Sequence, residues 1–277
     1  IAWITPKDLS TFSSRYIERG ERNITEIGLK SCSTQLLPKD TVLFSSRAPI
    51  GYVAIAANEV CTNQGFKSVV PNENTDPLFL YYLLKYNKDK IEGMGSGTTF
   101  KEVSGNTMKN IVVSVPTDKK VQMRISSMLG SIDDKIEENE RINNNLEQQA
   151  QAIFSNEFLT LETLPDGWKQ ASLIDIADYL NGLAMQKYRP TANETGIPVL
   201  KIKELRQGCC DDNSELCSPN IKSEYIIHDG DVIFSWSGSL LVDFWCGGIC
   251  GLNQHLFKVT SNKHDKWFYY VWTKHHL

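Results

Sequence analysis

Residues that could carry catalysis are spread along this 277-residue chain without the spacing that an active site requires. Asp133-Asp134-Lys135 matches the carboxylate and lysine cluster of nucleases, but the surrounding pattern predicts that it lies on the exposed side of a long helix. All five histidines follow residue 227, and they support no Ser/His/Asp or Cys/His arrangement. No glycine-rich cofactor loop accompanies Asp76-Pro77, which is typical of a helix cap followed by a proline. We therefore predict a non-enzymatic chain that needs no cofactor.

The seven cysteines, an odd number, favour reduced and partly buried thiols over a metal site. Five of them cluster without the paired CxxC spacing of zinc ribbons, namely Cys209, Cys210, Cys217, Cys246 and Cys250. No signal peptide precedes Ile1 and no run approaches the ~20 apolar residues of a membrane span, so we expect a cytoplasmic protein with no membrane partner. The missing initiator Met suggests a fragment or a shortened chain.

Composition and charge limit the classes of partner. With 41% apolar and 22% charged residues, the chain is typical of a soluble globular protein, and its length suits two domains. The net charge of −4 divides into 13 basic and 12 acidic residues in 1–118, 5 and 7 in 119–158, and 11 and 14 in the remainder. Because no general basic field exists, a DNA-binding role would need local patches or a more basic partner.

Lys119–Phe158, with one glycine and no proline, is predicted to form one long helix. At ~1.5 Å per residue it would reach ~60 Å. Alternating steps of four and three residues trace a heptad seam through Ile125, Leu129, Ile132, Ile136, Asn139, Asn143, Leu146, Ala150 and Ile153. Such a seam needs a partner helix, and its two asparagines favour one register or pairing. The alternative is that the seam packs on a globular body.

The segments on either side of this helix resemble each other, which predicts two copies of one α+β module. At an offset of 190 residues, Leu36–Gly51 aligns with Ile226–Leu241, and Asn63-Gln64 falls on Asn253-Gln254. At an offset of 196, the apolar residues of Ile1–Ser10 match those of a later segment. Each copy has short alternating apolar runs bounded by Gly, Pro and Asn, the pattern of β-strands, followed by a helical run.

Four segments together resemble the specificity subunit of type I restriction-modification enzymes, the HsdS family. Ser104–Phe158 is similar to the conserved central region of that family, with Ile-Asp near the middle of the helix and Ala-Ile-Phe near its end. Leu164–Leu183, beginning LPDGW, resembles the opening of a target recognition domain. GDVIFSWSG at Gly230–Gly238 and GLNQHLFKV at Gly251–Val259 resemble its later strands. The resemblance covers essentially the whole chain.

The resemblance implies two target recognition domains that each read one half of a split double-stranded DNA target. It also implies a helical rod that spaces them, and modification subunits, possibly with restriction subunits, that clasp the rod and supply catalysis. The implied boundaries are 1–118, 119–158 and 159–277, with the first domain lacking its LPDGW-like opening and the second its end. The partner helix would lie antiparallel in the full-length chain or come from a second copy. The rival hypotheses are a coiled-coil scaffold that binds proteins and a stand-alone DNA-binding regulator.

Base contacts are expected from polar or basic side chains on loops near the repeated strands. Ser46-Arg47 and Trp236-Ser237 occupy equivalent but divergent positions, as two different half-sites would require, and a surface turn is the alternative for each. A hairpin-shaping role competes with base readout for the two glutamines. The base-edge candidates are Ser46, Arg47, Trp236, Ser237, Gln64, Gln254 and His255. The phosphate candidates, for which a solvated charge is the alternative, are Lys67, Thr98, Thr99, Lys101, Lys187, Arg189, Lys201, Lys203 and Arg206.

Overall fold

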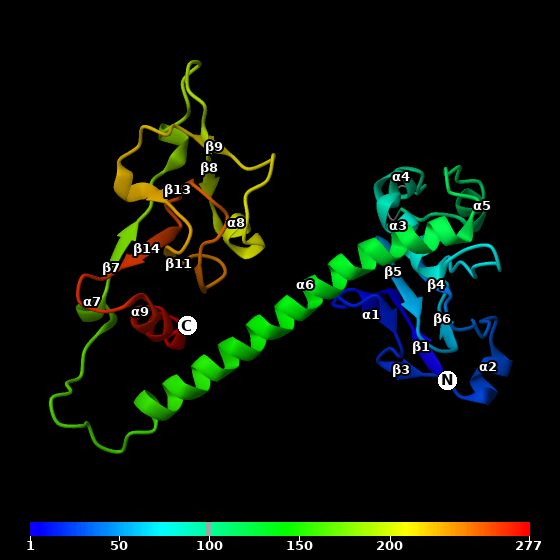
Figure 1. The fold of residues 1–277 in the computed structure, drawn as a ribbon, viewed down its shortest axis with the longest axis horizontal. Coiled ribbons are helices and arrows are strands. Elements are labelled where there is room, and N and C mark those ends of the chain that lie inside the picture. The colour runs from blue at the N-terminus through cyan, green and yellow to red at the C-terminus, as the bar shows by residue number, and fades with distance from the viewer. Residues whose placement is uncertain (98–100) are drawn as a thin grey trace. The chain divides into compact units, whose positions relative to one another are not determined.

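The computed structural model describes residues 1–97 and 101–277, so Thr98 and Thr99 lie outside the described residues. The chain forms two compact units, Ile1–Asn145 and Leu146–Leu277, each with its own sheets. A long helix joins these two sheet-rich parts of the chain (Figure 1). Among the residues described, no helix combines the length and apolarity needed to cross a membrane.

The first unit contains two small sheets, one of which includes the β4–β5 hairpin. Its strands, in the orders β3-β1-β6 and β2-β5-β4, are β1 (Ala2–Ile4), β2 (Tyr16–Ile17), β3 (Arg22–Asn23), β4 (Val42–Ser46), β5 (Ile50–Ala56) and β6 (Val60–Thr62). Its helices are α1 (Pro6–Leu9), α2 (Glu26–Ser31), α3 (Pro77–Tyr86), α4 (Lys88–Gly93), α5 (Gly105–Lys109) and most of α6 (Lys119–Phe154). Every residue of β4 is buried because Val42 and Phe44 pack towards α3 while Leu43 joins a second core with Ile4.

The second unit repeats this plan. Its strands are β7 (Asp178–Asn181), β8 (Ile197–Leu200), β9 (Leu216–Cys217), β10 (Ile226–Ile227), β11 (Val232–Ser235), β12 (Leu241–Phe244), β13 (Cys250–Leu252) and β14 (Leu256–Thr260). They form sheets of order β10-β13-β8-β9 and β12-β11-β14-β7. Its helices are α7 (Leu173–Ile176), α8 (Ile202–Gln207) and α9 (Lys266–His275).

Strand register confirms the internal repeat. Val42 pairs with Val69 in the first unit, and Val232 pairs with Val259 in the second, so the offset of 190 holds for both partners. β1 pairs with β6 in parallel, as β8 pairs with β13, and both hairpins β4–β5 and β11–β12 are antiparallel. The predicted α+β class with two related modules and a long intervening helix is therefore confirmed.

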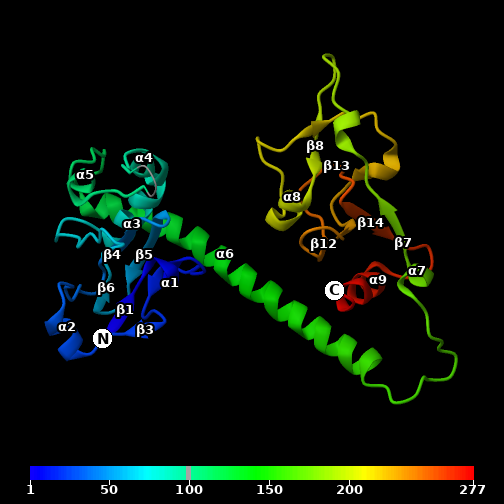
Figure 2. The same cartoon turned by 180° about the vertical axis from the view of Figure 1, so that it is seen from behind.

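Helix α6 docks on the first unit through a polar face. It ends at Phe154 and continues as a π-helical turn over Ser155–Leu159, close to the predicted end at Phe158. Gln122, Ser126 and Gly130, spaced four apart, are the buried positions of its first three turns. Viewed from either side, α3 lies along this part of α6 (Figure 2).

The apolar seam of α6 is exposed. The exposed fraction rises from 38% at Ile125 to 64% at Ile153, and Ile132 and Ile136 reach 58% and 50%. Within the described residues, the seam therefore does not pack on a globular body, which was the alternative considered above. The seam remains available for a partner helix.

The N-terminus of α3 anchors the start of α6. Asp76, the N-cap of α3, accepts hydrogen bonds from the Phe79 N–H (2.8 Å) and the Ser126 hydroxyl (2.7 Å). The Asp76 N–H donates to the side-chain oxygen of Gln122 (3.0 Å). Because buried Gln122 and Ser126 both bond half-buried Asp76, these contacts fix both the axial and the rotational position of the helix.

A second contact, centred on Arg15, holds the next two turns of α6. Arg15, whose side chain is 11% exposed, forms an ion pair with Asp134 and donates to the Gly130 carbonyl (3.2 Å). The Tyr82 hydroxyl donates to Asp133 (2.8 Å), and burial together with this bond raises the pKa of Tyr82. Asp133 is half-buried against Tyr82, whereas Asp134 pairs with Arg15 and stays 65% exposed. The predicted solvated face is therefore confirmed for Asp134 and Lys135, and only in part for Asp133.

Arg15→Ala is expected to loosen α6 from the first unit. The variant loses charge-assisted hydrogen bonds worth about 1.5–3 kcal/mol in the unfolding free energy of this unit. Urea unfolding followed by amide exchange in α6 measures the loss. Arg141→Ala is the matched control, because Arg141 pairs with Glu138 on the same exposed helix turn and its loss should matter less. Equal effects of the two variants would show that Arg15 does not anchor the helix.

Candidate nucleic-acid interface

The hairpin end of the first unit, defined as the β4–β5 loop with residues 63–67, carries a charged cluster. The Val103 N–H donates to the carbonyl of Ser46 (3.0 Å), which brings Glu102 beside the end of β4. The Glu102 carboxylate lies 3.7 Å from the Arg47 guanidinium and 3.2 Å from the Lys67 ammonium. One partly exposed carboxylate therefore holds two cations at this end.

Serine side chains shape the loop. The Ser45 hydroxyl donates to the Pro49 carbonyl (2.8 Å) and accepts from the Tyr52 N–H (2.8 Å), which closes the hairpin. Ser46 is fully buried, and its hydroxyl lies 3.2 Å from the Gly65 carbonyl, to which it donates. Contrary to the sequence-based prediction, Ser46 is a support for the loop and offers no accessible group to a base.

The hairpin end of the second unit, the β11–β12 loop with residues 253–257, is aromatic. Trp236 is 43% exposed and its indole N–H donates to the Asn181 side-chain oxygen (3.3 Å). Its ring centroid lies 6.1 Å from that of exposed His255. The half-buried Ser237 carbonyl accepts from the Ser235 hydroxyl (3.3 Å). This end combines a stacking surface with an imidazole.

The two hairpin ends are equivalent in the fold and different in chemistry. At the offset of 190 confirmed by strand register, Arg47 corresponds to Ser237 and Lys67 corresponds to Phe257. A cationic end in one unit thus corresponds to an aromatic and polar end in the other. Two copies of one scaffold carry different sets of contact groups at the same place.

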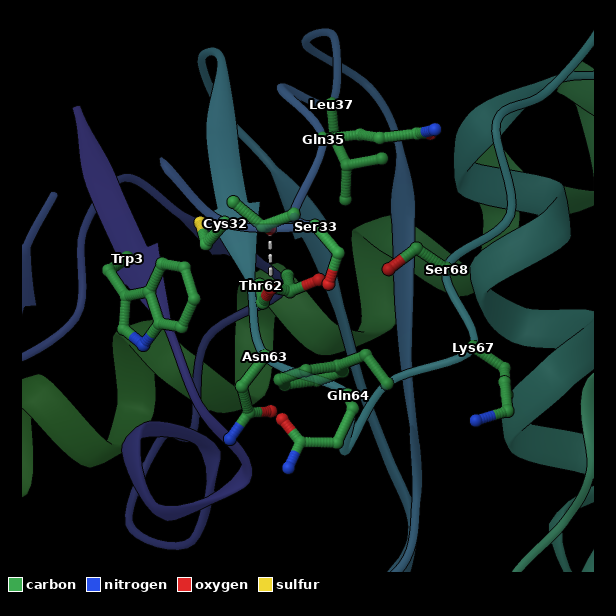
Figure 3. A pocket seen from close by; sticks show the side chains of 12 residues that line it. Trp3, Cys32, Ser33, Gln35, Leu37, Thr62, Asn63, Gln64, Lys67 and Ser68 are labelled. Carbon is green, nitrogen blue, oxygen red and sulfur yellow. Dashed lines mark hydrogen bonds between the residues drawn. The ribbon is translucent and has the colours of Figure 1, made fainter. Parts of the chain in front are cut away.

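The repeated Asn-Gln pair divides its roles between the two residues. Asn63 accepts from the Gly65 N–H (3.0 Å) and Asn253 accepts from the His255 N–H (3.2 Å), so asparagine shapes each turn. Gln64 is exposed at the rim of a hollow of about 530 Å³ (Figure 3). Gln254 is half-buried, with its amide nitrogen 3.4 Å from the His255 ring. The hairpin-shaping role expected for glutamine is therefore filled by its neighbour.

The predicted phosphate contacts fall into two groups. Glu215 holds both Arg189 (2.5 Å) and Lys201, and Asp211 holds Lys203 (3.2 Å). The hydrogen bond from Lys201 holds the pKa of Glu215 below its usual value. The exposed candidates that have no ion-pair partner in the described part of the chain are Lys101, Lys187 and Arg206. Among the predicted phosphate contacts in residues 1–97 and 101–277, these three are the cations left free to bind phosphate.

Sequence reasoning missed Glu102, Glu215 and Asn181, which position the candidate side chains. Glu102 is distant in sequence from Arg47, and no local pattern marks such a partner. Asn181 lies on β7 and reaches Trp236 through the sheet, so its role depends on strand order. The repeated Asn-Gln pair indicated a turn in each unit. The pattern did not indicate that asparagine, and not glutamine, forms the hydrogen bond of that turn.

In the described residues, no group of three His, Cys, Asp or Glu side chains is arranged to hold a metal ion. All seven cysteines are free thiols, of which Cys61, Cys217 and Cys250 are buried. Burial raises the pKa of Cys217 to about 11, so this side chain stays a protonated thiol near neutral pH. Cys32, Cys209 and Cys246 are exposed, so the prediction of partly buried thiols holds for only part of the set.

Comparison with known proteins places this scaffold. Residues 1–148 match the model of the type I restriction modification DNA specificity domain. The chain is 35% identical over 284 residues to the type I restriction enzyme MjaIX specificity subunit of Methanocaldococcus jannaschii, covering 95% of this chain and 64% of that protein. It is 23% identical to the EcoKI specificity subunit of Escherichia coli K12, covering 87% of this chain and 56% of that protein.

A solved structure agrees at the level of fold. The type I restriction-modification S subunit from M. genitalium aligns with a TM-score of 0.51 and 18% identity, covering 94% of this chain and 68% of that chain. The present chain thus spans less than two thirds of the length of the curated relatives named above. On the match over residues 1–148, supported by the shared fold, the chain belongs to the family of type I restriction-modification DNA specificity domains.

Proposed function

We propose that this chain is the non-catalytic, sequence-specific DNA recognition part of a type I restriction-modification system. The observation that carries the proposal is the pair of hairpin ends, which are equivalent in register and different in side chains. Each would read one half of a split target in double-stranded DNA. We assign 1–118 and 159–277 to the two recognition domains and 119–158 to the spacer helix, in a cytoplasmic protein.

Catalysis would come from modification subunits, possibly joined by restriction subunits. The exposed seam of α6 supports docking of a partner helix, either antiparallel in the full-length protein or from a second copy. The net charge of −4 supports weak DNA binding by the specificity chain alone. Affinity should rise when the modification subunits are added, and tight, sequence-specific binding by the lone chain at physiological salt would contradict this.

Arg47→Ala should relax base preference in one half-site and leave the other unchanged. A lost base-edge contact costs about 1–3 kcal/mol of discrimination, or roughly 5- to 150-fold. Trp236→Ala should relax the other half-site. Methylation profiling of full-length protein with its modification subunits, over random-sequence duplexes, measures both. Arg22→Ala is the matched control, since Arg22 is an exposed arginine on β3 and should change neither base preference. An unchanged profile for Arg47→Ala would mean that Arg47 belongs to a surface turn and does not contact a base.

Glu102→Gln should strengthen non-specific DNA binding. The substitution keeps the side-chain shape but releases the Arg47 and Lys67 cations that the carboxylate now holds. Each released cation that meets a phosphate steepens the slope of log K against log salt by about 0.9. Glu59→Gln is the control, because Glu59 is an exposed residue of the same unit with the same charge change. If both variants shift the salt slope equally, the effect is general charge and not release of the two cations.

The rival function, a scaffold whose two domains bind proteins, makes a different prediction. Duplexes of random sequence would then show no enriched split motif, with or without modification subunits. The same profiling experiment therefore separates the two hypotheses.

A further inference from the structure

One strand edge is covered in the second unit and open in the first. In the second unit, β7 pairs with the outer edge of β14, with Lys258 opposite Leu180. The equivalent segment of the first unit, residues 66–70, pairs on its other side with β4 through bridges at Phe66 and Val69. Within the described residues, no strand pairs with the outer edge of this segment.

Hydrogen-bond directions show that this open edge is ready for a strand. Val69 exchanges both backbone hydrogen bonds with Val42 (2.9 and 2.8 Å), so the N–H and C=O of Ser68 point the opposite way. In the described part of the chain, no backbone hydrogen bond reaches Ser68. Its hydroxyl is also buried without a partner. The unpaired backbone N–H and C=O of Ser68 form an open strand edge, and such an edge can pair with an added strand.

The hollow beside this edge is also filled in the second unit. After β7, the Leu183 N–H donates to the Leu252 carbonyl (2.9 Å) and the Leu183 carbonyl accepts from the Gln254 N–H (2.9 Å). Met185 then enters the core, where it is 1% exposed and packs with Val199. The chain from Gly182 to Met185 therefore fills a site formed by β8, β13 and the Asn-Gln turn.

The equivalent site of the first unit is the hollow of about 530 Å³, whose lining side chains are drawn in Figure 3. At the offset of 196, Trp3 corresponds to Val199. At the offset of 190, Thr62 corresponds to Leu252 and Gln64 to Gln254. No backbone hydrogen bond reaches the Gln64 N–H among the residues described, and the Thr34 hydroxyl bonds the Thr62 carbonyl (2.8 Å) where Leu183 would. Because Ser68 also lines this hollow, the hollow and the Ser68 edge form one continuous slot.

We propose that this slot takes an extended segment of the same protein, joined ahead of Ile1, with the pattern of Asp178–Lys187. The segment would add a strand along Ser68, then a glycine, then an apolar side chain against Trp3. The glycine is required because a Cβ at Gly182 would lie 2.2 Å from the Asn253 carbonyl oxygen, a backbone atom that cannot move freely. The segment would reach the slot because its equivalent in the second unit precedes β8 in the chain, and a segment joined ahead of Ile1 would precede β1 in the same way.

The added segment would also contribute to the hairpin end, a step that rests on the proposed DNA-reading function. In the second unit, Asn181 on β7 accepts the Trp236 indole N–H (3.3 Å). The equivalent residue of the added strand lies beside Ser46 and Arg47. The contact surface of the first unit is thus shared between the described chain and one side chain of this segment.

The test joins a copy of Ala177–Gly196 ahead of Ile1, because Gly196 precedes Ile197 as the joined residue precedes Ile1. Hydrogen exchange of the full chain follows the amides of residues 62–70 with and without the fusion. The Ser68 and Gln64 amides should exchange at least about tenfold more slowly in the fusion, since both gain acceptors and the tether supplies a high effective concentration.

A matched fusion carries Leu180→Pro and Gly182→Val in the added copy. Proline removes the N–H that pairs with Ser68, and valine meets the backbone of the Asn-Gln turn. This fusion should leave exchange at Ser68 and Gln64 as in the unfused chain. Equal exchange in all three proteins would overturn the proposal, as would a free nucleoside monophosphate that protects the hollow of the unfused chain while the fusion does not. The readout contains no DNA, so it stands or falls separately from the proposed function.

Discussion

A chain carrying Ile132→Asp and Ile136→Asp is expected to lose the pairing of its long helix and its assembly with modification subunits. Both isoleucines lie on the exposed seam, at 58% and 50% exposure. Burying each against a partner helix is worth about 1.5–3 kcal/mol, so the double variant should weaken assembly at least about 100-fold. An aspartate in the closed seam would also be desolvated without a partner, which adds to the loss.

Sedimentation of the full-length protein with its modification subunits, followed by the rate of DNA methylation, measures this loss. Ser127→Asp with Ser131→Asp is the matched control, because these exposed positions add the same charge to a face of α6 that neither docks nor belongs to the seam. The control should assemble and methylate normally. If the seam variant assembles as well as the control does, the seam is not a pairing surface and the proposed helical partner is wrong.

Features written in local periodicity could be predicted from the sequence. The seam of α6 follows from apolar residues at alternating steps of four and three, and the paired modules follow from matching apolar patterns at two constant offsets. The modules were found because two segments of the same chain share one apolar pattern. The seam depends on residues near one another in the chain. For this reason the helix end was also predicted to within a turn.

Contacts between distant segments could not be predicted in the same way. The docking face of α6 is formed by Gln122, Ser126 and Gly130, whose polar or small side chains give no apolar signal although they are buried. Their burial depends on Asp76 and Arg15, which fold next to them from far away in the sequence. A pattern that assigns polar residues to solvent will misplace such a face, as it did in part for Asp133, which is half-buried against Tyr82.

The contact groups at the hairpin ends show the same limit. The repeat located Ser46-Arg47 and Trp236-Ser237 at matched positions. It did not reveal that Arg47 forms an ion pair with Glu102 or that the Trp236 indole donates to Asn181. Ser46 was misplaced because alternation in β4 breaks down where both faces of the strand are covered. The sequence repeat therefore predicted where the candidate surface lies. Which side chains are accessible on that surface depends on the order of the strands, which the sequence did not show.

Inserting four residues after Asn144 is expected to lengthen the spacer between the two half-sites by one or two base pairs, with both half-sites unchanged. The α6 helix has 36 residues. At ~1.5 Å per residue it is a rod of ~54 Å, and four more residues add ~6 Å with a rotation of roughly 40° beyond a full turn. A rise of ~6 Å corresponds to one or two steps of B-DNA at about 34–36 Å per turn of 10–10.5 pairs. A four-residue insertion also keeps the apolar stripe nearly continuous, so the seam can still pair.

Sequencing of methylated sites gives the spacer length for each variant. The control inserts the same four residues after Glu162, in an exposed loop beyond the helix, where the chain becomes longer but the rod does not. That variant should keep the original spacer. A seven-residue insertion after Asn144, which preserves the heptad register, should add about three base pairs, since it lengthens the rod by ~10.5 Å. Active protein with an unaltered spacer in both helix insertions would mean that α6 does not set the distance between the half-sites, and that the spacing is fixed by the modification subunits instead.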